Sequence, residues 1–184
     1  MASVLIPLAE GCEELEAVTM IDLLRRAGIT VTTASLGHQT QLTASRQVGL
    51  VADTLLDTVL DDDFDMILLP GGQPGTDHLN NDHRVHALIK RLQQDNRYLA
   101  AICAAPMVLA SAGVLEGKRA TSYPGALDQS QWPTIEIGDD PVVIDGKILT
   151  SRGPGTAMDF ALTIIELLSS RTTRDQVETS LVRP

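Results

Sequence analysis

The chain has 184 residues, which fits a single domain (residues 1–184) built around one hydrophobic core. A hydrophobic fraction of 43% and a charged fraction of 21% are typical of a folded globular domain and exclude a disordered chain. The formal net charge of -10 would repel phosphate backbones and anionic lipids, so neither nucleic acids nor membrane surfaces are expected partners.

Strands and helices alternate along the sequence. The predicted strands are rich in β-branched or other apolar residues, and the predicted helices carry apolar residues three and four positions apart. We expect strands over residues 3–9, 30–36, 64–69, 98–102, 142–144 and 147–150. We expect helices over residues 13–27, 82–94, 104–112, 155–168 and 173–181, with a short hairpin or irregular excursion over residues 42–53.

Local signals delimit several of these elements. Gly28 and Gly113 end the helices before them, and Asp82 is a suitable N-cap for the helix that follows. Asp145 and Gly146 form a two-residue hairpin signal between the last two strands. The alternation predicts an α/β fold: a mostly parallel, doubly wound sheet with helices on both faces. Ligands bind beyond the carboxyl ends of strands in such sheets.

The sequence contains no apolar run near the ~20 residues needed to cross a bilayer. Its first eight residues lack the basic region and cleavage site of a signal peptide and favour a first strand instead. Two cysteines, Cys12 and Cys103, cannot form a disulfide framework and would remain thiols in a reducing compartment. We therefore expect a cytoplasmic protein.

Cys103 lies between the strand 98–102 and the helix 104–112, in the segment AAICAAP. The two residues after it are small alanines, and Pro106 suits the first helical turn. Unpaired N–H groups at a helix N-terminus favour a thiolate over a thiol. The arrangement predicts a reactive nucleophile in a turn like a nucleophile elbow. The alternative is a small buried cysteine without chemistry.

Two adjacent glycines, Gly71 and Gly72, follow the strand 64–69 at the same expected edge of the sheet. They allow a sharp turn that exposes backbone N–H groups. The N–H of Gly72, together with that of Ala104, can form an oxyanion hole beside Cys103. An ordinary tight turn is the alternative.

Glu16 lies in the first predicted helix, on the edge of the apolar arc near Met20 and Leu23. A carboxyl in that position should be partly desolvated, with its pKa raised. Such a group can donate a hydrogen bond to a thiolate or its oxidised product, and can act as general acid and base. A glutamate at the rim that reaches solvent is the alternative.

Other candidates carry weaker signals. Cys12 is more consistent with a small structural residue, although it would approach its symmetry mate if that edge formed a dimer interface. The glycine-rich turn over residues 151–155 either lines the same pocket or only begins a helix. No phosphate-binding loop, dinucleotide fingerprint or metal-ligand spacing is present, so we expect neither a cofactor nor a metal.

The segments GCEELEAVT, LLPGG, AAICAAP and ILTSRGPGTAMDFAL together resemble the ThiJ/PfpI superfamily. The resemblance is to the branch of the Parkinsonism-associated deglycase (DJ-one) and the bacterial YajL-like proteins, and it runs nearly end to end. It implies a flavodoxin-like sandwich that forms homodimers. It also implies that Cys103 is the oxidation-sensitive cysteine, that Glu16 hydrogen-bonds it, and that Gly72 and Ala104 supply the backbone donors.

The resemblance implies two kinds of activity. One is glutathione-independent, glyoxalase- or deglycase-type chemistry on small reactive aldehydes such as methylglyoxal, or on glycated groups. The other is a redox-regulated chaperone or oxidative-stress sensor that acts through Cys103 and binds unfolded proteins, with little catalysis. The first is the main hypothesis.

Two positions distinguish this chain from relatives. Vertebrate members carry a histidine where this chain has Tyr123, and a phenol with a pKa near 10 is no substitute for imidazole as a base at neutral pH. Glu16 is therefore the main acid-base candidate. The peptidase branch carries a histidine directly after its cysteine, and this chain has Ala104 there, so proteolysis is not expected.

Overall fold

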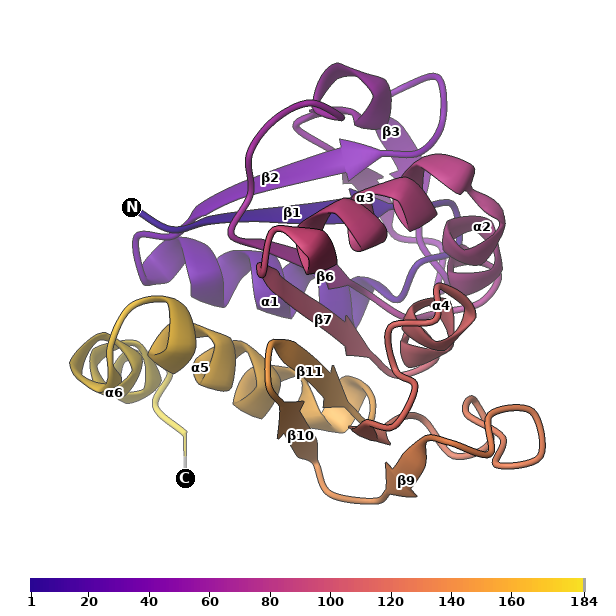
Figure 1. Ribbon diagram of the computed structural model, residues 1–184. Coiled ribbons are helices and arrows are strands. Elements are labelled where there is room, and N and C mark those ends of the chain that lie inside the picture. Colours follow the sequence, from indigo (N-terminus) through magenta and orange to yellow (C-terminus); the bar gives the residue numbers. More distant parts are fainter. Residues whose placement is uncertain (184) are drawn as a thin grey trace.

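A computed structural model describes residues 1–183. Its centre is a seven-stranded sheet in the order β10-β11-β7-β6-β1-β2-β5 (Figure 1). All neighbouring strands are parallel except the hairpin partners β10 and β11. The strands of this sheet are β1 (Ser3–Leu8), β2 (Thr30–Ser35), β5 (Thr54–Leu55), β6 (Met66–Leu69), β7 (Tyr98–Ile102), β10 (Val142–Asp145) and β11 (Ile148–Ser151).

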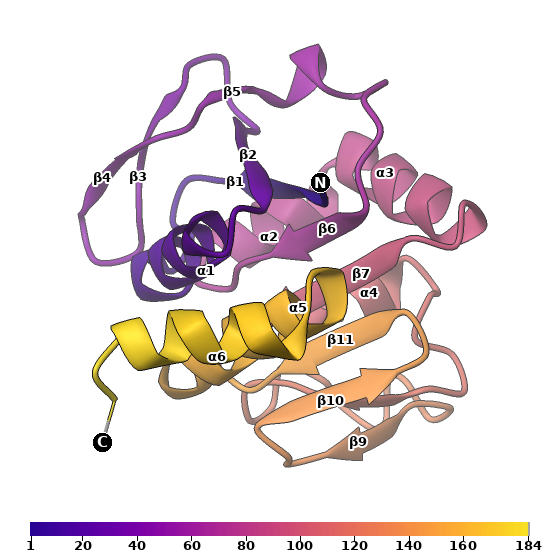
Figure 2. The ribbon, with the colours of Figure 1, turned by 90° about the vertical axis from the view of Figure 1, so that its left-hand side faces the viewer.

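Helices cover both faces of the sheet, so the core has two halves. On one face lie α1 (Glu14–Arg26), α5 (Ala157–Leu168) and α6 (Arg171–Ser180), and Figure 2 shows α5 and α6 side by side. On the other face lie α2 (Gly75–Asn81), α3 (His83–Gln94) and α4 (Pro106–Ser111). The four residues of β6 are completely buried between the layers. These features confirm the predicted doubly wound α/β fold.

The predicted excursion over residues 42–53 is a two-stranded hairpin, β3 (Gln41–Thr43) with β4 (Gly49–Val51). Asp82 caps α3 as predicted, because its carboxylate accepts from the N–H of Arg84 at 2.9 Å. The hairpin at Asp145 and Gly146 is also confirmed. No helix within residues 1–183 has both the length and the apolar character to cross a bilayer.

Some elements differ from the sequence prediction. The helix α2 and the pair β8 (Arg119–Thr121) and β9 (Glu136–Gly138) were not predicted. Nor were β5 and two 3₁₀ turns, Leu56–Thr58 and Pro154–Thr156. The helix expected from residue 104 begins at Pro106, and the one expected from residue 155 begins at Ala157, since a tighter turn precedes each. The helix α6 begins at Arg171 rather than 173, because the Ser170 side chain caps it.

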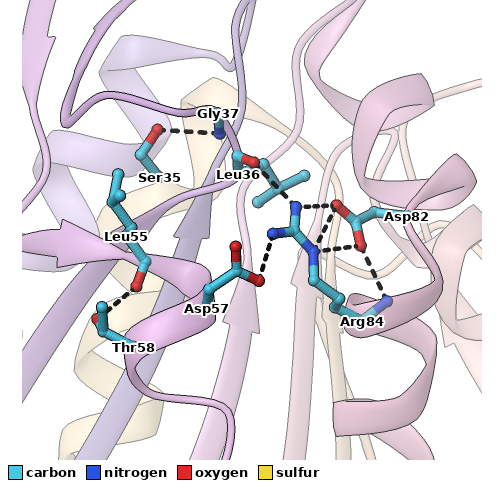
Figure 3. A network of polar contacts seen from close by, with 8 residues as sticks. All are labelled: Ser35, Leu36, Gly37, Leu55, Asp57, Thr58, Asp82 and Arg84. Atoms are coloured by element: carbon cyan, nitrogen blue, oxygen red, sulfur yellow. Dashed lines mark hydrogen bonds and ion pairs between the residues drawn. The ribbon is translucent and has the colours of Figure 1, made fainter.

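One arginine joins the end of β2 to the start of α3 (Figure 3). Arg84 donates to the Leu36 carbonyl at 2.9 Å, to Asp57 at 2.8 Å and to the Asp82 carboxylate. Burial raises the pKa of Asp82, but the hydrogen bonds and charge of Arg84 outweigh it and hold that pKa below its ordinary value. The network ties the carboxyl end of β2 to the first turn of α3.

Candidate active site

Cys103 follows β7 with a backbone φ of +64°, in the left-handed region that non-glycine residues rarely adopt. That strain is of order 1–2 kcal/mol and persists only where surrounding contacts impose it. Here the Cys103 N–H donates to the Ser151 carbonyl at 3.0 Å, and the Cys103 carbonyl accepts from Tyr123 N–H at 2.8 Å. The positive φ between β7 and α4 confirms the predicted elbow-like turn, in which Cys103 is only partly buried.

Glu16 projects from the first turn of α1 into the interior and has no exposed surface. Its Oε2 accepts from the Gly71 N–H at 2.9 Å. Its Oε1 is buried and has no hydrogen-bond partner within residues 1–183. The alternative of a glutamate that reaches solvent is therefore wrong.

The two glycines after β6 allow the backbone to pass between these groups. A Cβ on Gly71 would lie 2.7 Å from the Cβ of Cys103 and 2.8 Å from Oε2 of Glu16. Gly72 has a φ of +92°, and a Cβ there would lie 2.3 Å from the backbone nitrogen of Glu13. No larger residue fits either place, so the close approach requires this pair.

The N–H groups of Gly72 and Ala104 both act on the Cys103 sulfur, where their hydrogen bonds lower its pKa. The structure therefore brings together all four predicted residues: Cys103, Glu16, Gly72 and Ala104. Sequence reasoning missed the part of Gly71, whose N–H holds the carboxyl. The adjacent glycines were the only available signal for it.

Burial raises the pKa of Glu16 to about 7, against the opposing hydrogen bonds from Gly71 and Cys103. The predicted rise is confirmed. Burial also raises the pKa of the Cys103 thiol to about 12, followed by the charge of an ionised Glu16. The backbone donors lower the pKa of this thiol as predicted, but desolvation and the charge of Glu16 oppose them.

The contribution of Glu16 to the pKa of Cys103 exists only while the carboxyl is charged. The two groups share one negative charge near neutral pH, and that charge is more stable on the atom with better solvation. The sulfur is partly exposed and has two N–H donors, whereas the carboxyl is fully buried and has one. This comparison favours a thiolate beside a protonated Glu16, with the proton on the unpartnered Oε1.

The turn after β11 also borders the sulfur. A Cβ on Gly153 would lie 4.0 Å from the Cys103 sulfur and 3.4 Å from Cδ2 of Tyr123. Tyr123 is 53% exposed, so its ring lies at the surface beside the site. This turn lies close to the Cys103 sulfur and leads into α5, so it does more than begin a helix.

Cys12 has no exposed surface and packs in the core beneath α1. Burial, followed by the charge of Glu14, raises the pKa of its thiol to about 12. These features favour the structural interpretation. Within residues 1–183, no three histidine, cysteine or acidic side chains are grouped as a metal would need.

The fold and the site define a class: α/β proteins in which a partly exposed cysteine follows a parallel strand and faces a buried glutamate. The model of the DJ-1/PfpI family matches residues 2–167. The chain belongs to the DJ-1/PfpI family.

The sequences of individual members of the family are similar to this chain over most of its length. The chain is 44% identical to Protein DJ-1 homolog A of Arabidopsis thaliana, over 98% of this chain and 46% of the relative. It is 42% identical to Protein dj-1beta of Drosophila melanogaster, over 98% of this chain and 96% of that relative. A relative from Caenorhabditis elegans, named Glutathione-independent glyoxalase DJR-1.2, is 35% identical over 91% of this chain and 88% of that relative. The chain spans less than half the length of the Arabidopsis relatives.

Solved structures agree with the fold. The crystal structure of Drosophila melanogaster DJ-1beta matches with a TM-score of 0.94 at 42% identity, covering 100% of this chain and 98% of that one. Oxidized Toxoplasma gondii DJ-1 matches with a TM-score of 0.92 at 35% identity, covering 99% and 98%. The expected flavodoxin-like fold is confirmed.

Proposed function

We propose that the protein is a cofactor-free enzyme that converts 2-oxoaldehydes, with methylglyoxal as the model substrate, into 2-hydroxy acids without glutathione. The observation that carries the proposal is the fully buried Glu16 carboxyl facing the partly exposed Cys103 sulfur. A pKa near 7 suits an acid-base group that both gives and takes protons at neutral pH. The name of the C. elegans relative supports the same chemistry.

In the first step, the Cys103 thiolate adds to the aldehyde carbon. A C–S bond forms, and the carbonyl π electrons move to the oxygen, which the N–H groups of Gly72 and Ala104 stabilise. Protonated Glu16 gives its proton to this oxygen. The product is a hemithioacetal, and Glu16 becomes a carboxylate.

In the second step, the Glu16 carboxylate removes the hydrogen on the former aldehyde carbon and returns a proton to the neighbouring carbon. Between these two transfers an enediol forms, and the hydroxyl proton on the former aldehyde oxygen moves to the ketone oxygen. The result is a 2-hydroxyacyl thioester on Cys103, and this internal redox change needs no external oxidant. Water then attacks the thioester and gives a proton to Glu16, while the C–S bond breaks. Lactate leaves with one proton to solvent, and the starting state returns.

Glycated groups offer the same reactive carbon. The Cys103 thiolate can take over the three-carbon methylglyoxal unit from a hemithioacetal or aminocarbinol on a protein. A C–S bond forms at the former aldehyde carbon, the bond from that carbon to the protein thiol or amine breaks, and Glu16 gives the leaving group its proton. We include such adducts in the proposed substrate class. Two free thiols suit a reducing compartment, and we propose the cytoplasm as the location.

The test measures lactate from methylglyoxal in purified protein, without glutathione and without amine buffers. Cys103→Ser should abolish lactate formation, and Glu16→Gln should lower kcat/KM by roughly 10²- to 10⁴-fold. Cys12→Ser is the matched control and should keep its activity, because the Cys12 thiol is fully buried in the core, whereas that of Cys103 is only partly buried. Full turnover by the Cys103 variant would overturn the proposal.

A second candidate function is an oxidative-stress sensor or redox-regulated chaperone. The unpartnered Oε1 of Glu16 favours it, because a protonated carboxyl there can donate to a sulfinate oxygen on Cys103. Peroxide would oxidise the thiolate to sulfenic and then sulfinic acid, with water as the by-product. Mass spectrometry after mild peroxide should find the added oxygen on Cys103. Oxygen on Cys12 alone would refute this function.

We also propose that the chain forms a homodimer. Two apolar side chains on α1 are exposed: Leu15 with an exposed fraction of 52% and Val18 with one of 47%. They support a face of α1 that a second copy of the chain covers. Sedimentation should show a species of twice the chain mass, and a monomer at all concentrations would contradict the proposal. Binding of unfolded proteins by the oxidised form belongs to the sensor hypothesis and shares its test.

A further inference from the structure

Arg152 differs from every other arginine of similar burial. Arg84, Arg91 and Arg174 are also partly buried, and each bonds carboxylates or backbone carbonyls. The guanidinium of Arg152 has no hydrogen bond or ion pair within the described chain, residues 1–183. Because a partly buried guanidinium without an acceptor is unfavourable, its environment suits an anion from outside the chain.

Both neighbours of Arg152 touch the reactive cysteine. The carbonyl of Ser151 accepts from the Cys103 N–H at 3.0 Å. A Cβ on Gly153 would lie 4.0 Å from the Cys103 sulfur. The N–H of Arg152 donates to the Pro141 carbonyl at 3.3 Å, which fixes its backbone. The unpaired cation therefore belongs to a segment held directly against the site.

The surroundings favour a carboxylate as the anion. Asp140, next to Pro141 in sequence, pairs with Arg119 at 3.7 Å and leaves Arg152 free. One guanidinium presents a fork of N–H donors that matches a carboxylate. In a chain of net charge -10, a single arginine suits a monoanion better than a phosphate dianion, which the acidic surface repels more strongly.

We propose that Arg152 binds the carboxylate of reactive aldehydes that Cys103 attacks, so that the preferred substrates are aldehydes that carry a carboxylate. The inference rests on the proposed function, because it names the substrate class of the same thiol. The Cys103 sulfur would add to the aldehyde carbon, the π electrons would move to oxygen, and Glu16 would protonate that oxygen. The carboxylate would remain on Arg152 throughout.

The sharpest test compares two alkylating reagents of similar size, anionic iodoacetate and neutral iodoacetamide. Both form a C–S bond with the Cys103 thiolate and release iodide, so the ionised fraction of the thiol cancels in the ratio of their rates. Arg152→Gln should lower the iodoacetate-to-iodoacetamide ratio by roughly threefold to tenfold. Arg152→Lys should retain part of the preference for iodoacetate, because lysine keeps the positive charge. Lys90→Gln is the matched control, since it removes an exposed cation from α3 on the other face of the sheet.

A second measurement uses glyoxylate, the simplest aldehyde with a carboxylate. Glyoxylate should slow iodoacetamide alkylation of the wild-type protein at lower concentrations than acetaldehyde does, and Arg152→Gln should remove this difference. An unchanged reagent ratio in folded Arg152→Gln, or an equal fall in Lys90→Gln, would overturn the proposal. If Arg152→Gln does not fold, Arg152→Lys and the comparison of glyoxylate with acetaldehyde in wild type decide. None of these readouts needs methylglyoxal turnover, so failure here is distinct from failure of the proposed enzyme.

Discussion

Replacing Glu16 with glutamine should stabilise the fold at neutral pH and leave its stability nearly unchanged in acid. Folding raises the pKa of this carboxyl from an ordinary 4.5 to about 7, chiefly by burial. An acid with a raised native pKa binds more protons folded than unfolded. The wild-type protein therefore loses stability as pH rises through 4.5, and the loss levels off above 7. At 1.36 kcal/mol per pH unit, the full effect is about 3 kcal/mol.

Glutamine keeps the shape of the side chain and an oxygen for the Gly71 N–H, but it has no proton to lose. The assay is urea unfolding of both proteins from pH 4 to 7.5. The difference in free energy of unfolding should grow in favour of Glu16→Gln by up to about 1.4 kcal/mol per pH unit between 4.5 and 7.

The same comparison in a Cys103→Ser background removes the thiol and isolates the carboxyl. There, too, Glu16→Gln should gain stability as pH rises, because burial is the main cause of the raised pKa. A difference between Glu16 and glutamine that stays constant from pH 4 to 7.5 would refute the reasoning, because it would mean that folding leaves the pKa of the carboxyl unchanged.

Three further outcomes follow from the structure. Gly71→Ala should lower stability by about 1–3 kcal/mol and abolish turnover, measured by urea unfolding and lactate formation, because its methyl group would overlap Cys103 and Glu16. Arg84→Leu should lower stability by about 2 kcal/mol in thermal or urea unfolding, because it leaves the partly buried carboxylate of Asp82 without its partner. Asp57→Asn should change stability by less than about 0.5 kcal/mol, because that carboxylate is largely exposed. Ultraviolet titration at the thiolate band should give a lower pKa for Cys103 in Glu16→Gln than in wild type, because the charge of an ionised Glu16 raises the pKa of that thiol; an equal or higher pKa in the variant would contradict the coupling of the two groups.

The missed elements share a physical cause. Helix α2 begins within a segment of glycines and prolines, which are poor helix formers, and it forms because its Leu79 is buried in the core. The strands β8 and β9 have three residues each and pair across a long loop. Stretches so short carry no measurable alternation, so only their packing partners define them.

The order of the longer strands and helices, the doubly wound sheet and the convergence of three strand ends could all be predicted from the sequence. Hydrophobic periodicity, glycines and helix caps are signals that short stretches of sequence carry. Once the strands are known, the rule that ligands bind at the carboxyl ends of parallel strands locates the site. The sequence also singled out Cys103, Glu16, Gly72 and Ala104.

How these groups affect one another depends on the packing of the folded chain. Desolvation depends on atoms that lie far apart in the sequence. For this reason the complete burial of Glu16, the rise in pKa of both members of the pair, and the hold of Gly71 on the carboxyl could not be read from spacing. The same holds for Arg152. Its guanidinium has no partner within residues 1–183, and this cannot be known from the sequence, because it depends on the positions of all neighbouring side chains.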